Sequence, residues 1–440
     1  MHVLIVGAGI GGLSAALSLH AVDIDVSVIE SAATLRPLGV GINLLPHAVR
    51  ELTELGLGDE LAASGIRTAE IVHFDRHGNR IWGVACGRHA GYHWPQYSIH
   101  RGELQMILLD AVRARLGPDT VRTGMTFLSF EESAGGGDGA HAGDGGVTVR
   151  VSDRASGGTT SLHADVLVGA DGLYSGVRAQ LHPDEPPPRW GGIKLWRGVT
   201  PGLPFLSGRT VAVSGTNAAR KFVAYPISRK AELQGGALIN WVAEVLIPGG
   251  PGSGSDGSGG SGAGSPWADW NQAGRTEDVL PWFADWTFDW LDIPALITDA
   301  AEVLEYPMVD RDPLPSWGRG RVTLLGDAAH PMYPIGANGG SQAVLDARVL
   351  AYSLATVASP DDALAAYEED RRETANAIVL ACRDMPADRM LHMVSVRAPA
   401  GFDQITDVLS AAELAAFDDA YRETTLPDVA ALNARPPLMP

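Results

Sequence analysis

The segment Val322–Ala347, VTLLGDAAHPMYPIGANGGSQAVLDA, decides how the rest of this chain can fold. Its first four residues are apolar and predict a short strand buried in a parallel sheet, which ends at Gly326-Asp327. A loop rich in proline and glycine follows, and the helical spacing of apolar residues resumes at Gln342. Free backbone N–H groups and the positive end of a helix dipole therefore meet at one point. The segment predicts a site for a negatively charged group, with the Asp327 carboxylate placed to accept hydrogen bonds from hydroxyls.

A second strand–loop–helix unit opens the chain. The hexapeptide Gly7-Ala8-Gly9-Ile10-Gly11-Gly12 has the spacing G-x-G-x-x-G, follows an apolar run and precedes residues with helical spacing. In this context Gly7 permits a tight turn, Gly9 lets a pyrophosphate approach the backbone, and Gly12 lets the helix pack closely on the strand. The hexapeptide predicts a dinucleotide site, with a tight turn that binds no ligand as the alternative.

Glu30 indicates which dinucleotide would bind. It ends a second apolar run, Val26–Ile29, at roughly the 20-residue distance expected for a ribose-binding acid. A carboxylate at this point accepts hydrogen bonds from ribose hydroxyls but repels a 2′-phosphate. We therefore expect FAD or NAD at the glycine motif, and not NADP.

The composition limits the class of protein and its partners. A length of 440 residues favours two domains or one large elaborated domain. The formal net charge of −19 argues against nucleic acid or an anionic membrane as a partner. The two cysteines have neither metal-ligand spacing nor a disulfide framework, and the apolar N-terminus lacks the basic region of a signal peptide. We expect a cytoplasmic protein without a metal site or a membrane-spanning segment.

Two further positions could contact the same ligand. Asp171-Gly172 follows a buried strand predicted over residues 165–170 and precedes a predicted helix at Ser175–Leu181. Taken alone, this pattern is better explained by a helix N-cap and a turn. Arg101 stands where a strand meets a predicted helix at Gly102–Leu116. It could meet a pyrophosphate, although an isolated arginine at a helix start is more often a surface cap or ion pair.

The middle of the chain has a different character. Strand-like runs follow one another at Ile193–Val199, Thr210–Val213, Lys221–Ile227 and Gly236–Val245 without a helix between them. This order predicts an antiparallel sheet inserted into an otherwise α/β chain. Residues 133–146 and 249–265 are rich in glycine and are predicted to be flexible loops.

These elements together resemble the FAD-dependent aromatic hydroxylases, the single-component flavoprotein monooxygenases of the p-hydroxybenzoate and salicylate hydroxylase type. More narrowly, four segments look like the phenazine-modifying monooxygenase branch. These are GVGINLLP (Gly39–Pro46), KLWRGV (Lys194–Val199), INWVAEV (Ile239–Val245) and GDAAHPMYPIGANGGSQA (Gly326–Ala343).

The resemblance implies a discontinuous Rossmann-like FAD-binding domain with an inserted antiparallel-sheet substrate domain. Residues 1–70, 101–182 and 312–395 would form the FAD-binding domain, and residues 71–100 and 183–311 the substrate domain. Residues 396–440 would form a partly helical C-terminal segment. Whether the protein is a monomer or a homodimer is left open.

The resemblance also implies which residues hold FAD. The glycine motif and Glu30 would bind the ADP half, Arg101 the pyrophosphate and Asp327 the ribityl chain, and the loop after it would meet the isoalloxazine edge. His330 would orient that loop and would not act as a base. The full predicted cofactor set is Gly7, Gly9, Gly12, Glu30, Arg36, Gly41, Arg101, Asp171, Asp327, Pro334, Gly336, Ala337, Asn338 and Gly339. The predicted substrate contacts are Trp196, Tyr225, Trp241 and Tyr333, each of which could instead be a packing residue.

The implied activity is hydroxylation of an aromatic, phenazine-like or polycyclic natural product by NAD(P)H and O2 through a flavin C4a-hydroperoxide. NADH or NADPH would bind transiently in a groove, since no second dinucleotide fold is present, and the sequence does not indicate which of the two is used. The alternatives are a flavin-dependent epoxidase or Baeyer–Villiger monooxygenase, and an FAD-containing protein that sequesters an aromatic drug without oxidising it.

Overall fold

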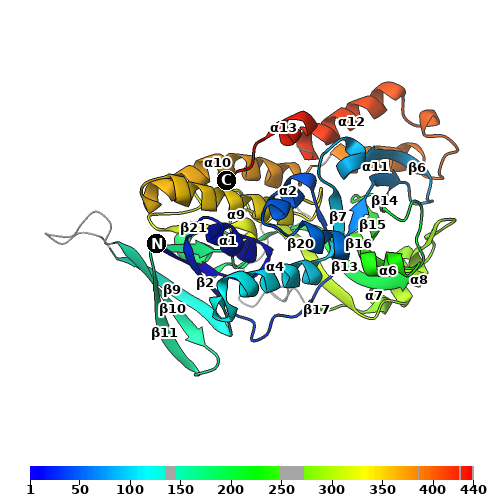
Figure 1. Cartoon of the computed structure of the whole chain (residues 1–440). Helices are drawn as coiled ribbons and strands as arrows, with labels where there is room; N and C mark the ends of the chain where they lie inside the picture. The colour runs from blue at the N-terminus through cyan, green and yellow to red at the C-terminus, as the bar shows by residue number, and fades with distance from the viewer. Residues whose placement is uncertain (134–144, 248–271, 385, 426–427, 439–440) are drawn as a thin grey trace.

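The strand that precedes the glycine motif, β1, is the central strand of a parallel five-stranded sheet in the computed structural model (Figure 1). The order is β21-β12-β1-β2-β8, and every neighbouring pair runs in the same direction. The strands are β1 (His2–Val6), β2 (Asp25–Glu30), β8 (Val121–Thr123), β12 (Val166–Gly169) and β21 (Val322–Leu324). The predicted Rossmann-like sheet is confirmed.

The structure describes residues 1–133, 145–247, 272–384, 386–425 and 428–438. The predicted flexible loop 249–265 lies outside these residues, as does nearly all of the predicted loop 133–146.

Both faces of the parallel sheet are covered, which explains its nearly continuous apolar strands. Helix α1 packs on one face, and α4 and α9 pack against α1 in turn. An antiparallel three-stranded sheet, β9-β10-β11, contacts the other face. Helix α10 packs on α9, and α5 contacts β9. The bounds of the elements in this unit are α1 (Ile10–His20), α4 (Arg101–Leu116), α5 (Gly176–Leu181), α9 (Asn338–Thr356), α10 (Pro360–Ala381), β9 (Met125–Ser133), β10 (Gly146–Asp153) and β11 (Gly158–Ala164).

The inserted unit is an eight-stranded sheet in the order β17-β20-β13-β16-β15-β14-β5-β6. Its strands are β5 (Glu70–Phe74), β6 (Arg80–Ala85), β13 (Arg189–Gly202), β14 (Thr210–Gly215), β15 (Arg220–Pro226), β16 (Ala237–Leu246), β17 (Gln272–Ala273) and β20 (Val303–Asp310). The predicted antiparallel pairing of the four strand runs is confirmed, and the structure adds one parallel pair, because β14 also pairs with β5. They are far apart in sequence, so no hairpin fixes their relative direction. A short helix, α6 (Arg229–Leu233), also interrupts the predicted run of strands.

A small sheet, β3-β7-β4, lies where the two units meet. It consists of β3 (Gly41–Leu44), β4 (Ile66–Thr68) and β7 (Gln96–His100), and α2 (Pro46–Glu54) and α3 (Gly58–Ser64) lie between its strands in sequence. On the far side of the large sheet, α7 (Thr276–Phe283) and α8 (Ile293–Thr298) cover a core rich in aromatic side chains.

The end of the chain packs first on the large sheet and then returns to the FAD-binding unit. Helices α11 (Pro386–Arg397) and α12 (Ala411–Thr425) lie beside β6 and β14, whereas α13 (Val429–Ala434) leads to α2, where Arg435 pairs with Glu51 (Figure 1). Met390 and Leu391 of α11 pack with Ile81 of β6, so part of the segment assigned in sequence to the FAD-binding domain contacts the inserted sheet. The division of the chain into domains stays a prediction.

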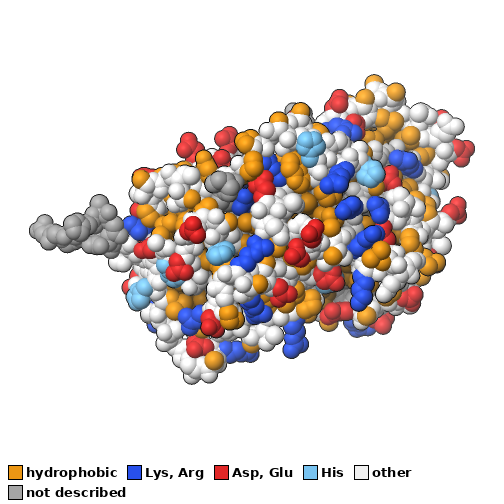
Figure 2. All heavy atoms as spheres, viewed as in Figure 1, with side chains coloured by type: hydrophobic (Ala, Val, Ile, Leu, Met, Phe, Trp, Pro, Cys, Tyr) orange, Lys and Arg blue, Asp and Glu red, His pale blue; other side chains and the backbone are white. Residues whose placement is uncertain are grey.

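Acidic and basic side chains are interspersed over the face shown in Figure 2, without a large area of one sign. Within the described ranges, no helix is long and apolar enough to cross a membrane, and no cluster of His, Cys, Asp and Glu has the arrangement of a metal site.

Candidate FAD site and adjoining sheet face

The predicted cofactor residues meet at the carboxyl edge of the parallel sheet. Glu30 ends β2, Gly7 follows β1, Asp171 follows β12 and Asp327 follows β21. These four strands are neighbours in the order β21-β12-β1-β2 and run the same way, so their carboxyl ends lie side by side. Ligands of doubly wound sheets bind at this edge.

The three motif glycines meet different surroundings, and this difference tests whether a ligand fits. A Cβ on Gly7, whose φ is +105°, would lie 2.4 Å from the Ala170 carbonyl oxygen, and one on Gly12 would lie 2.0 Å from the Gly7 carbonyl oxygen. Packing within the protein therefore excludes a side chain at both. A Cβ on Gly9 would have nothing within 4 Å. The protein itself would therefore tolerate a side chain at Gly9. A ligand that contacts the backbone there, such as a pyrophosphate on the N-terminus of α1, would not tolerate one.

Glu30 is held beside the glycine loop by backbone donors. The Ala8 N–H donates to Oε2 at 2.9 Å, and the Ala32 N–H donates to Oε1 at 2.7 Å. The carboxylate is therefore fixed at the end of β2, where a ribose would lie if the pyrophosphate is at Gly9.

Asp171 also caps a helix, as the alternative interpretation of its sequence indicated. Its Oδ1 accepts from the Ser175 hydroxyl at 2.5 Å and its Oδ2 from the Gly176 N–H at 2.8 Å. Burial raises the pKa of this carboxyl above its ordinary value although these bonds act in the opposite direction. Because its backbone lies against Gly7, Asp171 is at the site, but its side chain is already engaged.

Arg101 lies on the face of α4 that meets the glycine loop. One turn further along that helix, the Gln105 Nε2 donates to the Ala8 carbonyl at 2.7 Å, which fixes the face. Arg101 is exposed and makes no ion pair in the described part of the chain. Arg36, in the loop after β2, is likewise exposed. Both arginines are therefore available to an anionic ligand.

Asp327 stands exposed between buried neighbours at the end of β21. A Cβ on Gly339 would lie 3.7 Å from its Oδ1, so the carboxylate is beside the first turn of α9. That helix begins at Asn338 and not near Gln342, because Ala337 adopts a left-handed conformation (φ 60°) and turns the chain directly into the helix. Backbone N–H groups at the start of α9 attract negative charge. The loop before the helix and its first turn contain the predicted residues Pro334, Gly336, Ala337, Asn338 and Gly339.

A buried charge network fixes the loop that carries Asp327. The carboxylate of Asp346, in α9, accepts from the His330 Nε2 at 2.5 Å and from the Gly326 N–H at 3.0 Å. The Arg371 Nε of α10 donates to its other oxygen at 2.9 Å. His330 therefore orients the loop from below, in line with its predicted role.

Gly41 has a packing role in the structure. Its N–H donates to the Asn240 Oδ1 at 2.6 Å, and a Cβ there would lie 2.7 Å from the Asn240 Cβ. The close approach of β3 to β16 explains the glycine without a ligand, and its place in the cofactor set stays a prediction.

The four predicted substrate contacts fall on two sides of the large sheet. Trp196 and Trp241 are buried in the core under α7 and α8, and their indole N–H groups bond to Glu305 and Thr200. They point away from the cofactor loop because side chains alternate along a strand, so a role in contacting substrate at the cofactor is wrong for this pair. Tyr225 lies on the opposite face, and Tyr333 packs against that face from the loop before α9.

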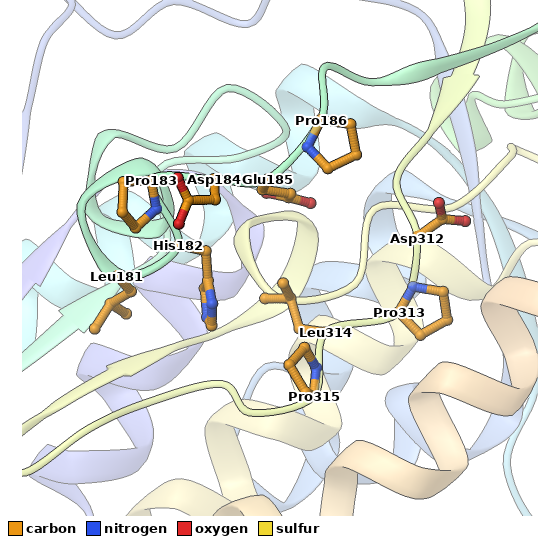
Figure 3. Close-up of a pocket in the computed structure, with 10 residues that line it drawn as sticks. All are labelled: Leu181, His182, Pro183, Asp184, Glu185, Pro186, Asp312, Pro313, Leu314 and Pro315. Carbon is orange, nitrogen blue, oxygen red and sulfur yellow. The ribbon is translucent and has the colours of Figure 1, made fainter. Parts of the chain in front are cut away.

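A pocket of about 390 Å³ lies elsewhere, between the two chain segments that join the parallel and large sheets (Figure 3). Residues 181–186 form one wall and residues 312–315 the other. None of the predicted site residues lines it. Three carboxylates and four prolines among its lining residues make it a poor site for a phosphate-bearing nucleotide.

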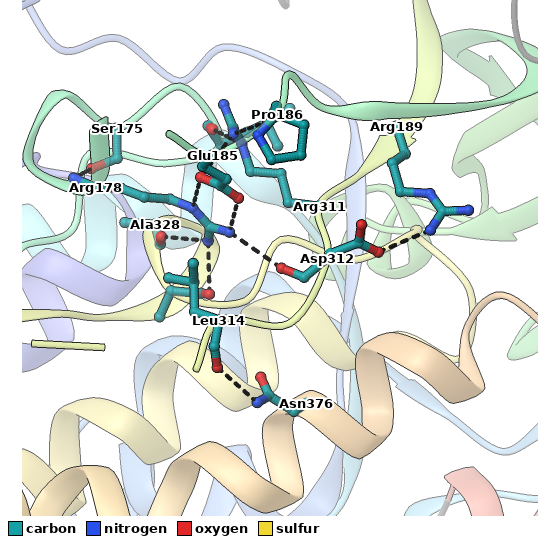
Figure 4. Close-up of polar contacts among 12 residues, drawn as sticks. Ser175, Arg178, Glu185, Pro186, Arg189, Arg311, Asp312, Leu314, Ala328 and Asn376 are labelled. Carbon is teal, nitrogen blue, oxygen red and sulfur yellow. Dashed lines mark hydrogen bonds and ion pairs between the residues drawn. The ribbon is translucent and has the colours of Figure 1, made fainter. Parts of the chain in front are cut away.

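Ion pairs beside this pocket tie the joining segments to the cofactor loop (Figure 4). Arg178 is buried, and its guanidinium pairs with Glu185 at 2.5 Å and donates to the carbonyls of Ala328 and Ala329 at 2.9 and 2.8 Å. Burial would raise the pKa of Glu185, but Arg178 and Arg311 outweigh it and lower that pKa. These contacts hold the segment that carries Glu185 against the loop that carries Asp327.

The fold and the site define a flavin-dependent oxidoreductase with a Rossmann-like FAD domain and an inserted substrate sheet. Residues 1–187 and 299–381 match the family model "FAD binding domain", and the chain belongs to this family.

The chain is 47% identical to the phenazine 1,6-dicarboxylic acid hydroxylase PhzS of Lysobacter antibioticus over 96% of both chains. It is 31% identical to 3-hydroxybenzoate 6-hydroxylase 1 of Aquipseudomonas alcaligenes over 84% of both. Among solved structures, Klebsiella pneumoniae HpxO with FAD and uric acid matches 96% of this chain and 93% of its own at 25% identity, with a TM-score of 0.69. The protein is an FAD-dependent monooxygenase of the aromatic hydroxylase type.

Two residues that hold the site in place were missed in the sequence. Gln105 and Asp346 carry no motif, because their partners are distant in the chain.

Proposed function

We propose that this protein hydroxylates a planar polycyclic aromatic compound of the phenazine type with NAD(P)H and O2. The observation that carries the proposal is the sheet face beneath the cofactor loop. Leu195, Val242 and Leu304 of this face pack with Val40 and Tyr333 from the segments that border the FAD site. A flat, mostly aliphatic face next to the cofactor suits a flat aromatic ring.

The chain's own residues would bind and orient both reactants. The glycine motif and Glu30 would hold the ADP half of FAD, Arg101 and Arg36 would meet the pyrophosphate, and Asp327 would accept from the ribityl hydroxyls. The N-terminus of α9 would stabilise negative charge on the ring system. FAD, when bound, supplies the activation of oxygen. The sheet would hold the substrate against the cofactor and keep water out.

The close identity to a phenazine dicarboxylate hydroxylase supports this substrate class over a simple benzoate. Within the described part of the chain, the predicted site residues include no histidine or carboxylate that faces the substrate position as a base. A phenolic substrate needs a base to remove its proton, whereas a phenazine ring carries no phenolic proton and does not need that base.

The test is anaerobic reduction of the holoenzyme by NADH and by NADPH, followed at the flavin absorbance. Phenazines, hydroxybenzoates and urate would be added in turn, and the reaction repeated in ¹⁸O₂. We expect a phenazine to accelerate reduction most and to gain one ¹⁸O in a ring hydroxyl. Stimulation by hydroxybenzoate or urate alone would overturn the substrate class. Binding of phenazines without turnover would favour a sequestering protein, and an epoxide or lactone product would favour the other oxygenase reactions.

A further inference from the structure

Tyr333 connects the cofactor loop to the inserted sheet. The cofactor loop is the segment between β21 and α9, residues 325–337, and the predicted cofactor residues Pro334 and Gly336 closely follow this tyrosine. The aromatic ring packs against the cluster of side chains that contains Leu304 and Met308 of the sheet. A movement of the ring on the sheet would therefore move the predicted cofactor residues with it.

A gap in the sheet at Gly191 accommodates the tyrosine hydroxyl. A Cβ on Gly191 would lie 2.8 Å from the Tyr333 Oη and 3.3 Å from its Cζ, and the next nearest atom also belongs to this tyrosine. The neighbouring Gly192 has a φ of +78°, which by itself favours glycine, but Gly191 has no such φ. The register of β13 against β20 also breaks here, between Trp190 and Lys194. The absence of a side chain at Gly191 is therefore explained by Tyr333.

A buried acceptor without a donor lies at the same end of the sheet. Asp310, at the end of β20, stands opposite Arg189 of β13, two residues before Gly191. Its side chain is fully buried, and its Oδ2 accepts from the Arg383 Nε at 2.6 Å. Its Oδ1 has no hydrogen-bond partner within the described residues. A buried carboxylate oxygen without a donor is costly, so this atom requires an explanation.

The hydroxyl of Tyr333 is available to supply the missing donor. Burial raises the pKa of Tyr333 to about 12, and the negative charge of Asp310 acts in the same direction, which indicates that the two groups are near each other. The hydroxyl therefore keeps its proton at neutral pH. It makes no hydrogen bond in the described part of the chain. Two positions are thus open to it: against Gly191, as in the structure, and at the Asp310 Oδ1.

We propose that Tyr333 is a positioning residue whose hydroxyl lies against Gly191 without substrate and donates to Asp310 when an aromatic ring occupies the sheet face, and that this change moves the cofactor loop. A planar substrate on the cluster against which Tyr333 packs would displace its ring, and the hydrogen bond to Asp310 would stabilise the displaced position. Substrate binding is thereby transmitted to the flavin. The proposal rests on the proposed function, because it concerns how that substrate controls the same site.

The experiment compares Tyr333→Phe, Gly191→Ala and the double variant as FAD-loaded proteins. Binding of phenazine-1,6-dicarboxylate is measured by equilibrium dialysis, and the surroundings of the flavin are followed by its visible circular dichroism. The rate of anaerobic flavin reduction by NADH and by NADPH is then measured with and without the phenazine. Tyr352→Phe, which removes an exposed hydroxyl from α9, is the control and should match wild type in every measurement.

Each variant has its own expected result. Tyr333→Phe should retain FAD and bind the phenazine, because the ring remains, but the phenazine should leave its circular dichroism unchanged and accelerate reduction about 10- to 100-fold less than in wild type. Gly191→Ala should show the circular dichroism and the faster reduction of the wild-type complex without any phenazine, since the methyl group excludes the hydroxyl. In the double variant the closest contact lengthens from 2.8 to 3.3 Å, so the alanine should add little to Tyr333→Phe.

The outcomes separate this proposal from the proposed function. A wild-type protein that does not bind the phenazine overturns both. A wild-type protein that hydroxylates it, while Tyr333→Phe keeps the full change in circular dichroism and the full acceleration, overturns only the role of Tyr333. An effect of Gly191→Ala that is equally large in both backgrounds does the same. If Gly191→Ala does not retain FAD, the comparison of Tyr333→Phe with Tyr352→Phe decides.

Discussion

Replacing Asp346 by Asn tests whether buried charge, and not the glycine-rich loop itself, holds the flavin-facing segment in place. The substitution keeps the size of the side chain and removes its charge. In the structure the carboxylate is fully buried and receives hydrogen bonds from His330, Gly326 and Arg371. Burial alone would raise the pKa of Asp346, but the neighbouring His330 and Arg371 outweigh it and lower that pKa.

The magnitude follows from what the variant leaves behind. Arg371 is 6% exposed and would lose its only carboxylate partner among the described residues, and removing one member of a buried ion pair costs about 3–5 kcal/mol. Because the pKa is lowered in the folded state, this stabilisation is present above the ordinary value near 3.8 and is lost as the pH falls through the folded-state pKa. At pH 7 the full effect should therefore be observed.

The assay is urea unfolding of the holoenzyme at pH 7, followed by far-UV circular dichroism and by the rise in flavin fluorescence. Asp346→Asn should lose about 3–5 kcal/mol and release FAD at a lower urea concentration. Combining it with Arg371→Met removes the uncompensated cation, so the double variant should lose less than the sum by about 0.5–3 kcal/mol. The exposed pair Arg422–Asp418 is the control, and Asp418→Asn should change stability by less than about 1 kcal/mol. A loss in Asp346→Asn no larger than in this control, or strict additivity in the double variant, would refute the reasoning.

Other changes have equally definite outcomes. Gly9→Ala should fold normally, because its Cβ meets no protein atom, yet it should retain less FAD. Gly12→Ala should not yield soluble folded protein, because its Cβ would overlap the Gly7 carbonyl oxygen. Equal FAD content in Gly9→Ala and wild type would exclude close contact between Gly9 and the cofactor. Asp327→Ala should leave unfolding by urea unchanged in the FAD-free protein, since the side chain is exposed, and should lower the flavin-to-protein ratio after gel filtration; an unchanged ratio would refute its assigned role. Burial lowers the pKa of His47 to about 3 and of His73 to about 4, from 6.5, so stability should fall as the pH drops below 6.5, by about 3 kcal/mol between pH 6.5 and 5 for the two groups. In His47→Leu the slope of unfolding free energy against pH should be about half as steep, and an unchanged slope would show that this histidine is protonated in the folded state.

Much of the FAD-binding unit could be predicted from local sequence. The glycine motif, the acid at the end of β2 and the loop after β21 are each set by neighbouring residues, because strand, turn and helix start follow one another without interruption. The strands β1, β12 and β21 are almost entirely apolar since both faces of their sheet are covered there, and such runs can be identified from sequence.

The adjoining substrate face could be predicted only in part. The alternation within β13 separates Leu195 and Arg197 from Trp196, but it does not indicate which set faces the cofactor. Large aromatic residues were therefore chosen as substrate contacts, and two of the four lie under α7 and α8. These two tryptophans fill the outer core, while the face next to the cofactor segments carries smaller aliphatic side chains together with tyrosines and charged residues.

The sequence by itself determined the dinucleotide-binding motif and the strand–turn–helix units that carry it, because each of those features depends on residues close together in the chain. Only the tertiary structure decided the order of the strands in the sheets, that Asp346, from α9, joins His330 and Arg371 beneath the loop, and that β14 pairs in parallel with β5. These arrangements depend on which face of one element meets another, and that choice is made by the burial of side chains over the whole fold and not by any local pattern.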